Sequence, residues 1–494
     1  MSMRRNIKTM LVIFAAMFVV LSVYLLYTVN AYGTRWFSNP YNTRLENQKN
    51  NIIAGDIKDR DGTTLAGTNT AGDRTYIDDS SMRKATAHAV GDNYGQTFGA
   101  ENFFSKYLLG FDQSLLERFS RMVSEKPSYG SDVYLTINAE LCDYIYAQMG
   151  DYKGAVVVMN YKTGEVYAKV SKPAFDPKYV AEYLSGKRAL AGGAMVNRVT
   201  SGRYTPGSVF KIVTAVAALR YIPYVESRTF QCGGPLAFDR QTGKYLPAIT
   251  IDEDEQTKAG ISGEYRVLRD YNGDYHGEID FVTAFNKSCN HVFAVLAMEI
   301  GADRLARVAK ELGVGDEFLF ADIVTASSSY EKPNSDVDLA WSGIGQYTDI
   351  MTPLHMCMIV AGIANEGVMM EPELLWDVRT TSGVSTYTRR SAIYKKALSV
   401  TEAAKLKAMM LSAVKNGTGR NAAIAGYDVG GKTGTAEVSS GAIKPNAWFV
   451  GFVDDHTHPI AICVVLEQGG SGGGNAAPVA GKALKKAIDL GVAK

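Results

Sequence analysis

Ser208 and Lys211 are spaced so that a lysine amine could activate a serine nucleophile. Residues three apart share one face of a helix, which brings the hydroxyl and the amine together. Only this Ser-x-x-Lys match opens an apolar stretch, 209–219, where the helix N-terminus would also offer free N–H groups to an oxyanion. The pattern therefore predicts a serine–lysine pair that attacks a carbonyl. The other three matches lie in polar or amphipathic sequence and begin at Ser81, Ser329 and Ser412.

Two further patterns could complete such a site. Ser-x-Asn occurs once, as Ser288-Cys289-Asn290, directly before an apolar segment. Lys432, Thr433 and Gly434 follow two glycines and precede Thr435. A strand edge made of small residues lets the backbone of a substrate approach closely. The other Lys-Thr-Gly, at 162–164, falls in a predicted turn.

The elements that must position these motifs are strands at both ends of one segment with helices between them. We predict strands over 154–160, 165–170, 448–453 and 460–466. We predict helices over 209–219, 291–300, 401–415 and 478–490. The fold class is therefore α+β, with a sheet that joins distant parts of residues 131–494.

The N-terminal segment is typical of a membrane anchor. Residues 10–29 are nearly all apolar, and a helix of that length covers ~30 Å, the thickness of a bilayer core. Arg4, Arg5 and Lys8 precede it without an acid, which keeps residues 1–9 in the cytoplasm and places the rest outside the plasma membrane. A cleaved signal peptide is the alternative, but its apolar region would be shorter. We predict a single-pass anchor at 10–30.

Composition excludes several classes of protein. The chain has 494 residues, 46% hydrophobic and 21% charged, with a net charge of +1, so it is neither disordered nor strongly basic, and we expect no nucleic acid partner. Its five cysteines are scattered, which argues against a disulfide scaffold or a zinc ribbon. Residues 31–130 are polar and mixed, and we predict a small β-rich membrane-proximal domain there.

The three motifs, in this order, resemble those of penicillin-binding proteins and serine β-lactamases. Further stretches resemble the class B penicillin-binding proteins, which are membrane-anchored monofunctional peptidoglycan D,D-transpeptidases. These stretches are 55–66, 197–198, 205–211, 343–346, 352–354, 447–451 and 472–478. The resemblance implies a C-terminal penicillin-binding/serine β-lactamase-like domain at 131–494, with an antiparallel sheet flanked by helices.

The resemblance also implies roles for single residues. Ser208 would attack the D-Ala-D-Ala carbonyl of a stem peptide, expel the terminal D-Ala and hold an acyl-enzyme until an amine of a neighbouring stem accepts it. Lys211 would take the Ser208 proton, and Ser288 would relay it to the leaving amine. β-Lactams would acylate the same serine.

Substrate binding is likewise implied by the resemblance. Asn290 would hold a substrate amide, while Lys432, Thr433 and Gly434 would accommodate the substrate carboxylate. The backbone N–H groups of Ser208 and Thr435 would bind the oxyanion. No metal or organic cofactor is expected. The expected partner is a polytopic membrane glycan polymerase.

Three other functions are possible for a protein with this domain. It could be a serine β-lactamase, a membrane-bound β-lactam sensor or a bifunctional enzyme with glycosyltransferase activity. Cys289, with Cys232 and His276 upstream, could bind zinc or form a disulfide, although packed thiols behind the site are the simpler interpretation. All of these functions require one geometry. The motifs must converge so that the Ser208 hydroxyl lies within hydrogen-bonding reach of two amines and a second hydroxyl.

Overall fold

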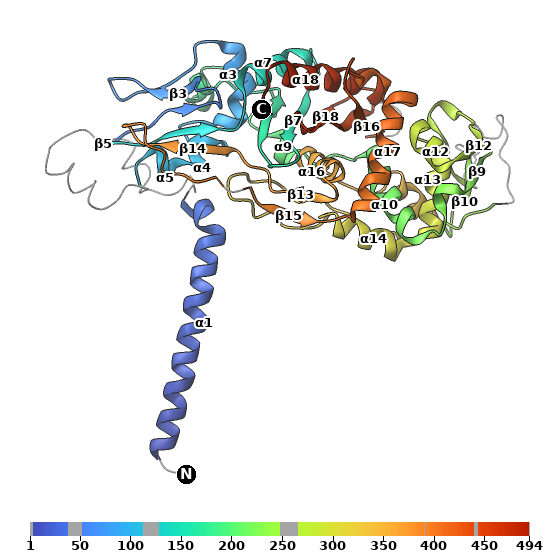
Figure 1. Cartoon of the computed structure of the whole chain (residues 1–494), viewed down its shortest axis with the longest axis horizontal. Coiled ribbons are helices and arrows are strands. Elements are labelled where there is room, and N and C mark those ends of the chain that lie inside the picture. The colour runs from blue at the N-terminus through green and yellow to red at the C-terminus, as the bar shows by residue number, and fades with distance from the viewer. Residues whose placement is uncertain are drawn as a thin grey trace.

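Two five-stranded sheets organise the described part of the chain. The computed structural model describes residues 3–37, 52–111, 128–247, 265–389, 391–438 and 443–493. Figure 1 shows the long N-terminal helix α1 (Met3–Phe37) standing clear of the other elements.

One sheet has longer strands than the other, and we call it the larger sheet. It contains the predicted strands. Its order is β16-β17-β18-β7-β8, and every neighbouring pair is antiparallel. The sheet joins residues 154–172 to residues 429–466, which confirms the prediction that it connects distant parts of the chain. The strands are β16 (Val429–Ala436), β17 (Asn446–Val453), β18 (Ile460–Leu466), β7 (Gly154–Asn160) and β8 (Val166–Lys172).

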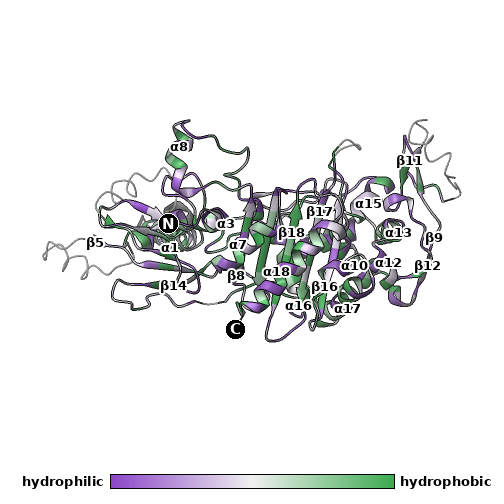
Figure 2. Ribbon diagram, turned by 90° about the horizontal axis from the view of Figure 1, so that it is seen from above, coloured by the Kyte–Doolittle hydropathy of each residue, from purple (hydrophilic) through white to green (hydrophobic). Residues whose placement is uncertain are grey.

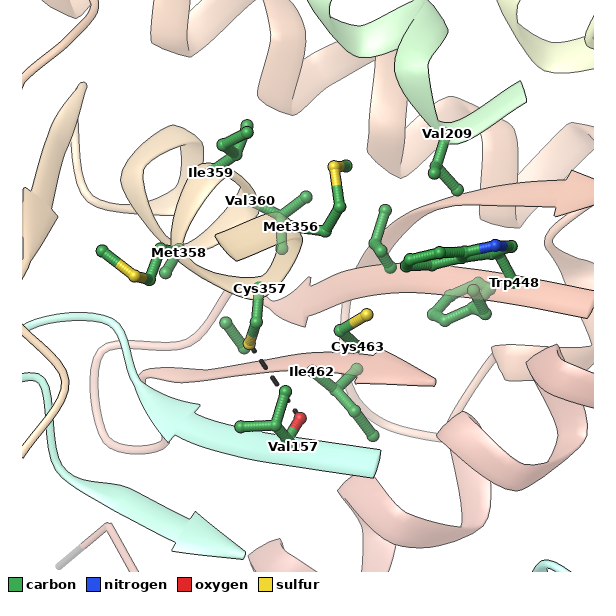
Figure 3. Packing of buried hydrophobic residues seen from close by; sticks show 14 of the residues in the cluster. Val157, Val209, Met356, Cys357, Met358, Ile359, Val360, Trp448, Ile462 and Cys463 are labelled. Carbon is green, nitrogen blue, oxygen red and sulfur yellow. Dashed lines mark hydrogen bonds between the residues drawn. The ribbon is translucent and has the colours of Figure 1, made fainter. Parts of the chain in front are cut away.

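Helices cover both faces of this sheet. Helix α16 (Pro353–Ala364) packs on β7, β17 and β18, and all of its residues are buried. Helices α7 (Ala139–Gln148) and α18 (Ala477–Asp489) cover the opposite face (Figure 1). Figure 3 shows the α16 side chains Met356 and Cys357 lying over Trp448 and Ile462. Apolar residues on both faces explain why the central strands are buried throughout.

A helical lobe lies beside β16, at the edge of the sheet (Figures 1 and 2). Its helix α17 packs on β16 and begins with a capping box in which Ser399 and Glu402 bind each other's backbone N–H groups. All four predicted helices are present, with ends within two residues of the prediction. The lobe comprises α10 (Lys211–Tyr221), α12 (Phe281–Lys287), α13 (Asn290–Ile300), α14 (Ala302–Glu311), α15 (Asp336–Gly343) and α17 (Val400–Asn416).

The second sheet has the order β14-β6-β2-β3-β4, and β2 and β6 are its parallel pair. Two of its strands, β6 and β14, come from beyond residue 130, so the predicted boundary between residues 130 and 131 passes through this sheet. The predicted division into domains therefore remains a prediction. The strands are β14 (Leu375–Arg379), β6 (Asp132–Leu135), β2 (Ile57–Lys58), β3 (Thr64–Thr68) and β4 (Arg74–Tyr76).

Helix α3 (Ser80–Val90) connects the two sheets because it packs on β8 of the first sheet and on β3 of the second. Four other helices are single turns: α4 (Ala100–Phe103), α5 (Ser105–Leu108), α8 (Val180–Leu184) and α9 (Arg198–Ser201). The remaining strands pair as β1 (Ile52–Ile53) with β5 (Ser128–Tyr129), β9 (Thr229–Cys232) with β12 (Gly277–Asp280), β10 (Leu236–Asp239) with β11 (Tyr265–Leu268), and β13 (Val368–Met370) with β15 (Ile393–Lys396).

Helix α1 is long and apolar enough to cross a bilayer. Residues Asn6–Thr28 reach a mean hydropathy of 2.6, and none of that stretch is buried in the protein. At 1.5 Å per residue they cover ~35 Å, slightly more than a hydrocarbon core. The prediction of an apolar helix at 10–30 is confirmed.

Replacing Ile462 with alanine should destabilise the protein. The side chain is fully buried in the middle of β18, and its loss leaves a cavity, so we expect Ile462→Ala to lower the free energy of unfolding by about 2–5 kcal/mol. Urea denaturation measures the change. The matched control is Ile393→Ala on β15, where the side chain is 52% exposed and the expected loss is below about 1 kcal/mol. Equal losses at the two positions would contradict the burial described above.

Candidate active site

Ser208 lies in a tight turn at the mouth of a cavity. Gly207 has φ 55°, and a Cβ there would lie 2.8 Å from the carbonyl oxygen of Thr435, so glycine is required. The chain then makes a single 3-10 turn over Gly207–Phe210 and continues directly into α10. Ser208 is half-buried and lines a cavity of 740 Å³.

Lys211 is the first residue of α10, and its side chain is fully buried. Its amine donates hydrogen bonds to Asn290 Oδ1 at 2.7 Å, to Ser288 Oγ at 3.3 Å and to the Ser288 carbonyl oxygen. Lys211 therefore contacts both polar side chains of the second motif. Its amine makes no hydrogen bond to Ser208 among the described residues, which differs from the geometry expected from the sequence.

The Ser288 hydroxyl accepts hydrogen bonds from the amines of both Lys211 and Lys432. Ser288 ends α12 in the left-handed region, with φ 58°, and Cys289 then caps the N-terminus of α13. This sharp reversal turns the Ser288 hydroxyl toward β16, where Lys432 donates to it at 2.8 Å. The hydroxyl that the two amines share is thus that of Ser288, and Ser208 faces the same cavity without joining this network.

The third motif lies on β16, the edge strand of the larger sheet. The Lys432 side chain is fully buried, and its amine also donates to the Thr433 carbonyl oxygen at 2.9 Å. Gly434 sits where a Cβ would lie 3.0 Å from the Pro206 carbonyl oxygen, so it allows the serine turn to approach the strand. Thr433 and Thr435 line the cavity beside them.

Burial controls the charge of both amines. It lowers the pKa of Lys211 to about 8, although the nearby Asp270 carboxylate opposes this shift. It also lowers the pKa of Lys432 well below its ordinary value, and the charge of Lys211 acts in the same direction. An amine with a pKa near neutrality can accept a proton from a hydroxyl, which an ordinary surface lysine does not do.

Further residues that line the cavity were not predicted as site residues from the sequence. Thr418 shares a hydrogen bond of 2.5 Å with Thr433, and Gln346 donates to the Thr435 carbonyl oxygen at 3.3 Å. Gln346 belongs to a stretch noted for its family resemblance, whereas the signal for Thr418 was its position just after the helix end at Gly417. Asp270 had no sequence signal, yet its carboxylate accepts the backbone N–H of Asn290.

The structure also brings together the three residues suggested as zinc ligands or as a disulfide. Cys232, His276 and Cys289 lie with Asp270 in one cluster whose ligand atoms are all within 4.8 Å of one another. The two sulfurs are 3.6 Å apart, and all five cysteines of the chain are free, so the structure contains no disulfide.

Comparison with known proteins places this arrangement among enzymes of cell-wall synthesis. The chain is 29% identical over 405 residues to the peptidoglycan D,D-transpeptidase PbpA of Mycobacterium tuberculosis, an alignment that covers 77% of each chain. It is 28% identical over 440 residues to the peptidoglycan D,D-transpeptidase MrdA of Haemophilus influenzae, covering 81% of this chain and 63% of that relative.

A solved structure shares the fold. The ceftriaxone acyl-enzyme complex of penicillin-binding protein A from M. tuberculosis superposes with a TM-score of 0.76 at 27% identity, covering 90% of this chain and 99% of that one. Residues 154–234 and 246–485, well over half of the sequence, match the penicillin-binding protein transpeptidase domain. The chain therefore belongs to the penicillin-binding protein transpeptidase family.

Proposed function

We propose that the protein is a membrane-anchored peptidoglycan D,D-transpeptidase that crosslinks stem peptides through an acyl-enzyme on Ser208. The observation that carries this proposal is the convergence of Lys211 and Lys432 on the Ser288 hydroxyl, beside a cavity that Ser208 lines. Residues from three distant segments meet there, as a serine acyl-transfer site requires. The relatives named as D,D-transpeptidases support the reaction class.

Acylation begins at Ser208. Lys211 in its neutral form takes the hydroxyl proton, directly or through Ser288, and Ser208 Oγ attacks the carbonyl of the penultimate D-Ala of a stem peptide. The C–N bond to the terminal D-Ala breaks, and Ser288, held by both amines, returns the proton to the leaving nitrogen. An amine of a neighbouring stem then attacks the ester, which forms the crosslink and restores Ser208.

The remaining motif residues hold the substrate. Asn290, fixed by Lys211, presents its side chain to a substrate amide. Lys432 and Thr433 meet the terminal carboxylate, and Gly434 leaves room for the peptide along β16. The N–H groups of Ser208 and Thr435 stabilise the oxyanion of the tetrahedral intermediate, which lowers the barrier to acyl transfer. β-Lactams acylate Ser208 by the same steps.

The membrane topology follows from the charge of the first residues. Arg4, Arg5 and Lys8 keep the N-terminus in the cytoplasm, so the catalytic domain at 131–494 works on the outer side of the plasma membrane, where peptidoglycan lies. The membrane-proximal domain, 31–130, and the anchor contact a polytopic glycan polymerase that supplies uncrosslinked strands.

Ser208→Ala should abolish labelling by a fluorescent penicillin, because the variant has no hydroxyl to form the acyl bond. Gel fluorescence of the purified full-length protein measures the label. The matched control is Ser329→Ala, the same change in another Ser-x-x-Lys sequence, whose hydroxyl accepts a surface hydrogen bond from Arg203. We expect that control to keep its label. Label retained on Ser208→Ala would remove the nucleophile assignment.

The acylation rate should rise with pH and level off above about pH 8. Lys211 acts as a base only when neutral, and below its pKa of about 8 the neutral fraction falls tenfold for each pH unit. Lys211→Met should slow acylation by roughly 10²–10⁴-fold and remove the rise near pH 8. Stopped-flow measurements with a fluorescent penicillin test both effects. A Lys211→Met variant that keeps the wild-type pH dependence would show that another group is the base.

The penicilloyl-enzyme should persist once it has formed. Hydrolysis needs a water molecule positioned beside a base, whereas the proposed acceptor of the acyl group is an amine of a neighbouring stem, which the assay does not contain. Loss of label is followed after free penicillin has been removed, together with the turnover of penicillin in solution. Rapid turnover would instead identify the protein as a serine β-lactamase.

A further inference from the structure

Residues 342–349 form a strap that leads from the end of α15 to the segment behind the serine turn. At its start, the Thr214 hydroxyl of α10 donates to the Gly343 carbonyl oxygen at 2.7 Å. Just beyond its end, Met351 exchanges two backbone hydrogen bonds with Tyr204, which precedes the serine turn. Both ends of the strap are therefore fixed to elements that carry the proposed serine–lysine pair.

The middle of the strap bridges the two sides of the proposed oxyanion hole. The Gly345 carbonyl oxygen accepts the backbone N–H of Gly207, the residue before Ser208, at 2.8 Å. The Gln346 side chain donates to the Thr435 carbonyl oxygen at 3.3 Å. A Cβ on Gly345 would lie 2.1 Å from the Gly207 carbonyl oxygen, so this approach requires glycine. Because the oxyanion N–H groups are assigned to Ser208 and Thr435, the strap contacts the chain beside each of them.

The first and last residues of the strap are joined by their side chains. The Ser342 hydroxyl donates to both carboxyl oxygens of Asp349, at 3.2 and 3.4 Å, and both residues are fully buried. Burial raises the pKa of the Asp349 carboxyl well above its ordinary value, and the hydrogen bond from Ser342 opposes this shift only in part. A neutral carboxyl both donates and accepts hydrogen bonds, so it closes the strap without a counter-ion.

A second contact leads from the same two residues to the serine turn. The Tyr330 ring stacks on the ring of Phe210, with centroids 5.7 Å apart, and Phe210 ends the 3-10 turn that holds Ser208. The Tyr330 hydroxyl is buried and faces Ser342 and Asp349. These two residues thus support the serine turn through an aromatic contact as well as through the strap.

We propose that Asp349 is a positioning residue for acyl transfer: its hydrogen bond with Ser342 closes the strap, and the closed strap sets the distance between the two N–H groups that bind the oxyanion. The inference deepens the proposed function and rests on its assignment of the oxyanion hole. Asp349 is fully buried and does not line the cavity, so it acts through Gly345 and Gln346. Oxyanion stabilisation depends on donors held in place, and a displacement of ~1 Å slows such a reaction strongly.

Stopped-flow acylation by a fluorescent penicillin tests the role on the full-length protein in detergent. Measurement over a range of concentrations separates the binding constant from the acylation rate constant. Asp349→Ala should lower the rate constant roughly tenfold to a hundredfold with little change in binding, because the oxyanion forms only after binding. Asp349→Asn should recover most of the rate, since the amide is neutral, has nearly the same shape, and both donates and accepts. Ser342→Ala, the milder variant, should lose roughly twofold to tenfold.

The matched control is Asp322→Ala, the same change at another buried carboxyl. Asp322 accepts the backbone N–H groups of Leu374 and Leu375 and does not line the cavity. Thermal unfolding of every variant is measured in parallel. The control should lose stability and keep the acylation rate constant, as a purely structural role would also predict for Asp349→Ala.

Four results would overturn the positioning role. They are an unchanged rate constant in Asp349→Ala, a loss confined to binding, equal slowing in Asp322→Ala, and an Asp349→Asn variant as slow as Asp349→Ala. If Asp349→Ala does not fold, Ser342→Ala decides, and its wild-type rate constant would overturn the role equally.

The test also separates this inference from the proposed function. The strap variants keep Ser208, so mass spectrometry of the labelled peptide should still locate the acyl group there. Slow acylation at Ser208 supports the positioning role. Label on another residue would instead defeat the nucleophile assignment, which Ser208→Ala examines with every residue of the strap in place.

Discussion

The site depends on two buried amines that share one hydroxyl. Lys211 and Lys432 both donate to Ser288 Oγ, so the two nitrogens are at most about 6 Å apart. Two positive charges at that distance repel each other by about 3 kcal/mol at an effective dielectric constant of about 20. Burial adds to the cost of charging either amine. A neutral lysine is therefore a consequence of the packing, and the proposed proton transfers start from it.

The fold supports this pair from three directions. Lys211 is held where a 3-10 turn becomes α10, Ser288 where α12 reverses into α13, and Lys432 on the edge strand β16. Small residues allow the close approach, since a Cβ on Gly207 or on Gly434 would meet neighbouring backbone. Strand β16 pairs with β17 along its whole length and packs against α17, so it has little freedom to shift. Rigid support is what a site of this precision requires.

The sequence predicted the elements whose patterns are local. Apolar runs bounded by turn residues located β7, β8, β17 and β18, and an amphipathic stretch with an Asn-Gly stop signal located α17. Helix α16 was not predicted because all of its residues are buried, which leaves no polar face and hence no helical period. Strand β16 is rich in glycine and shows no alternation, so only its motif marked it.

The contacts within the site depend on tertiary packing. Sequence spacing placed Ser208 and Lys211 on one helical face, and the 3-10 turn also aligns residues three apart. The Lys211 amine nevertheless donates to Ser288 and Asn290, which only tertiary packing brings near it. Asp270 was missed because a single aspartate in a polar loop has no pattern, and only the pairing of β9 with β12 brings its partners Cys232 and His276 together.

Helix α1 does not end where its apolar stretch ends. The stretch finishes at Thr28, and the helix runs on to Phe37, about 13 Å farther along its axis. With α1 as the anchor, the chain leaves the bilayer as a continuous rod, so a change in tilt within the lipid is carried past the headgroups and not absorbed by a swivel at the surface. A helix that continues past its apolar stretch in this way transmits any change in its tilt to residues 29–37.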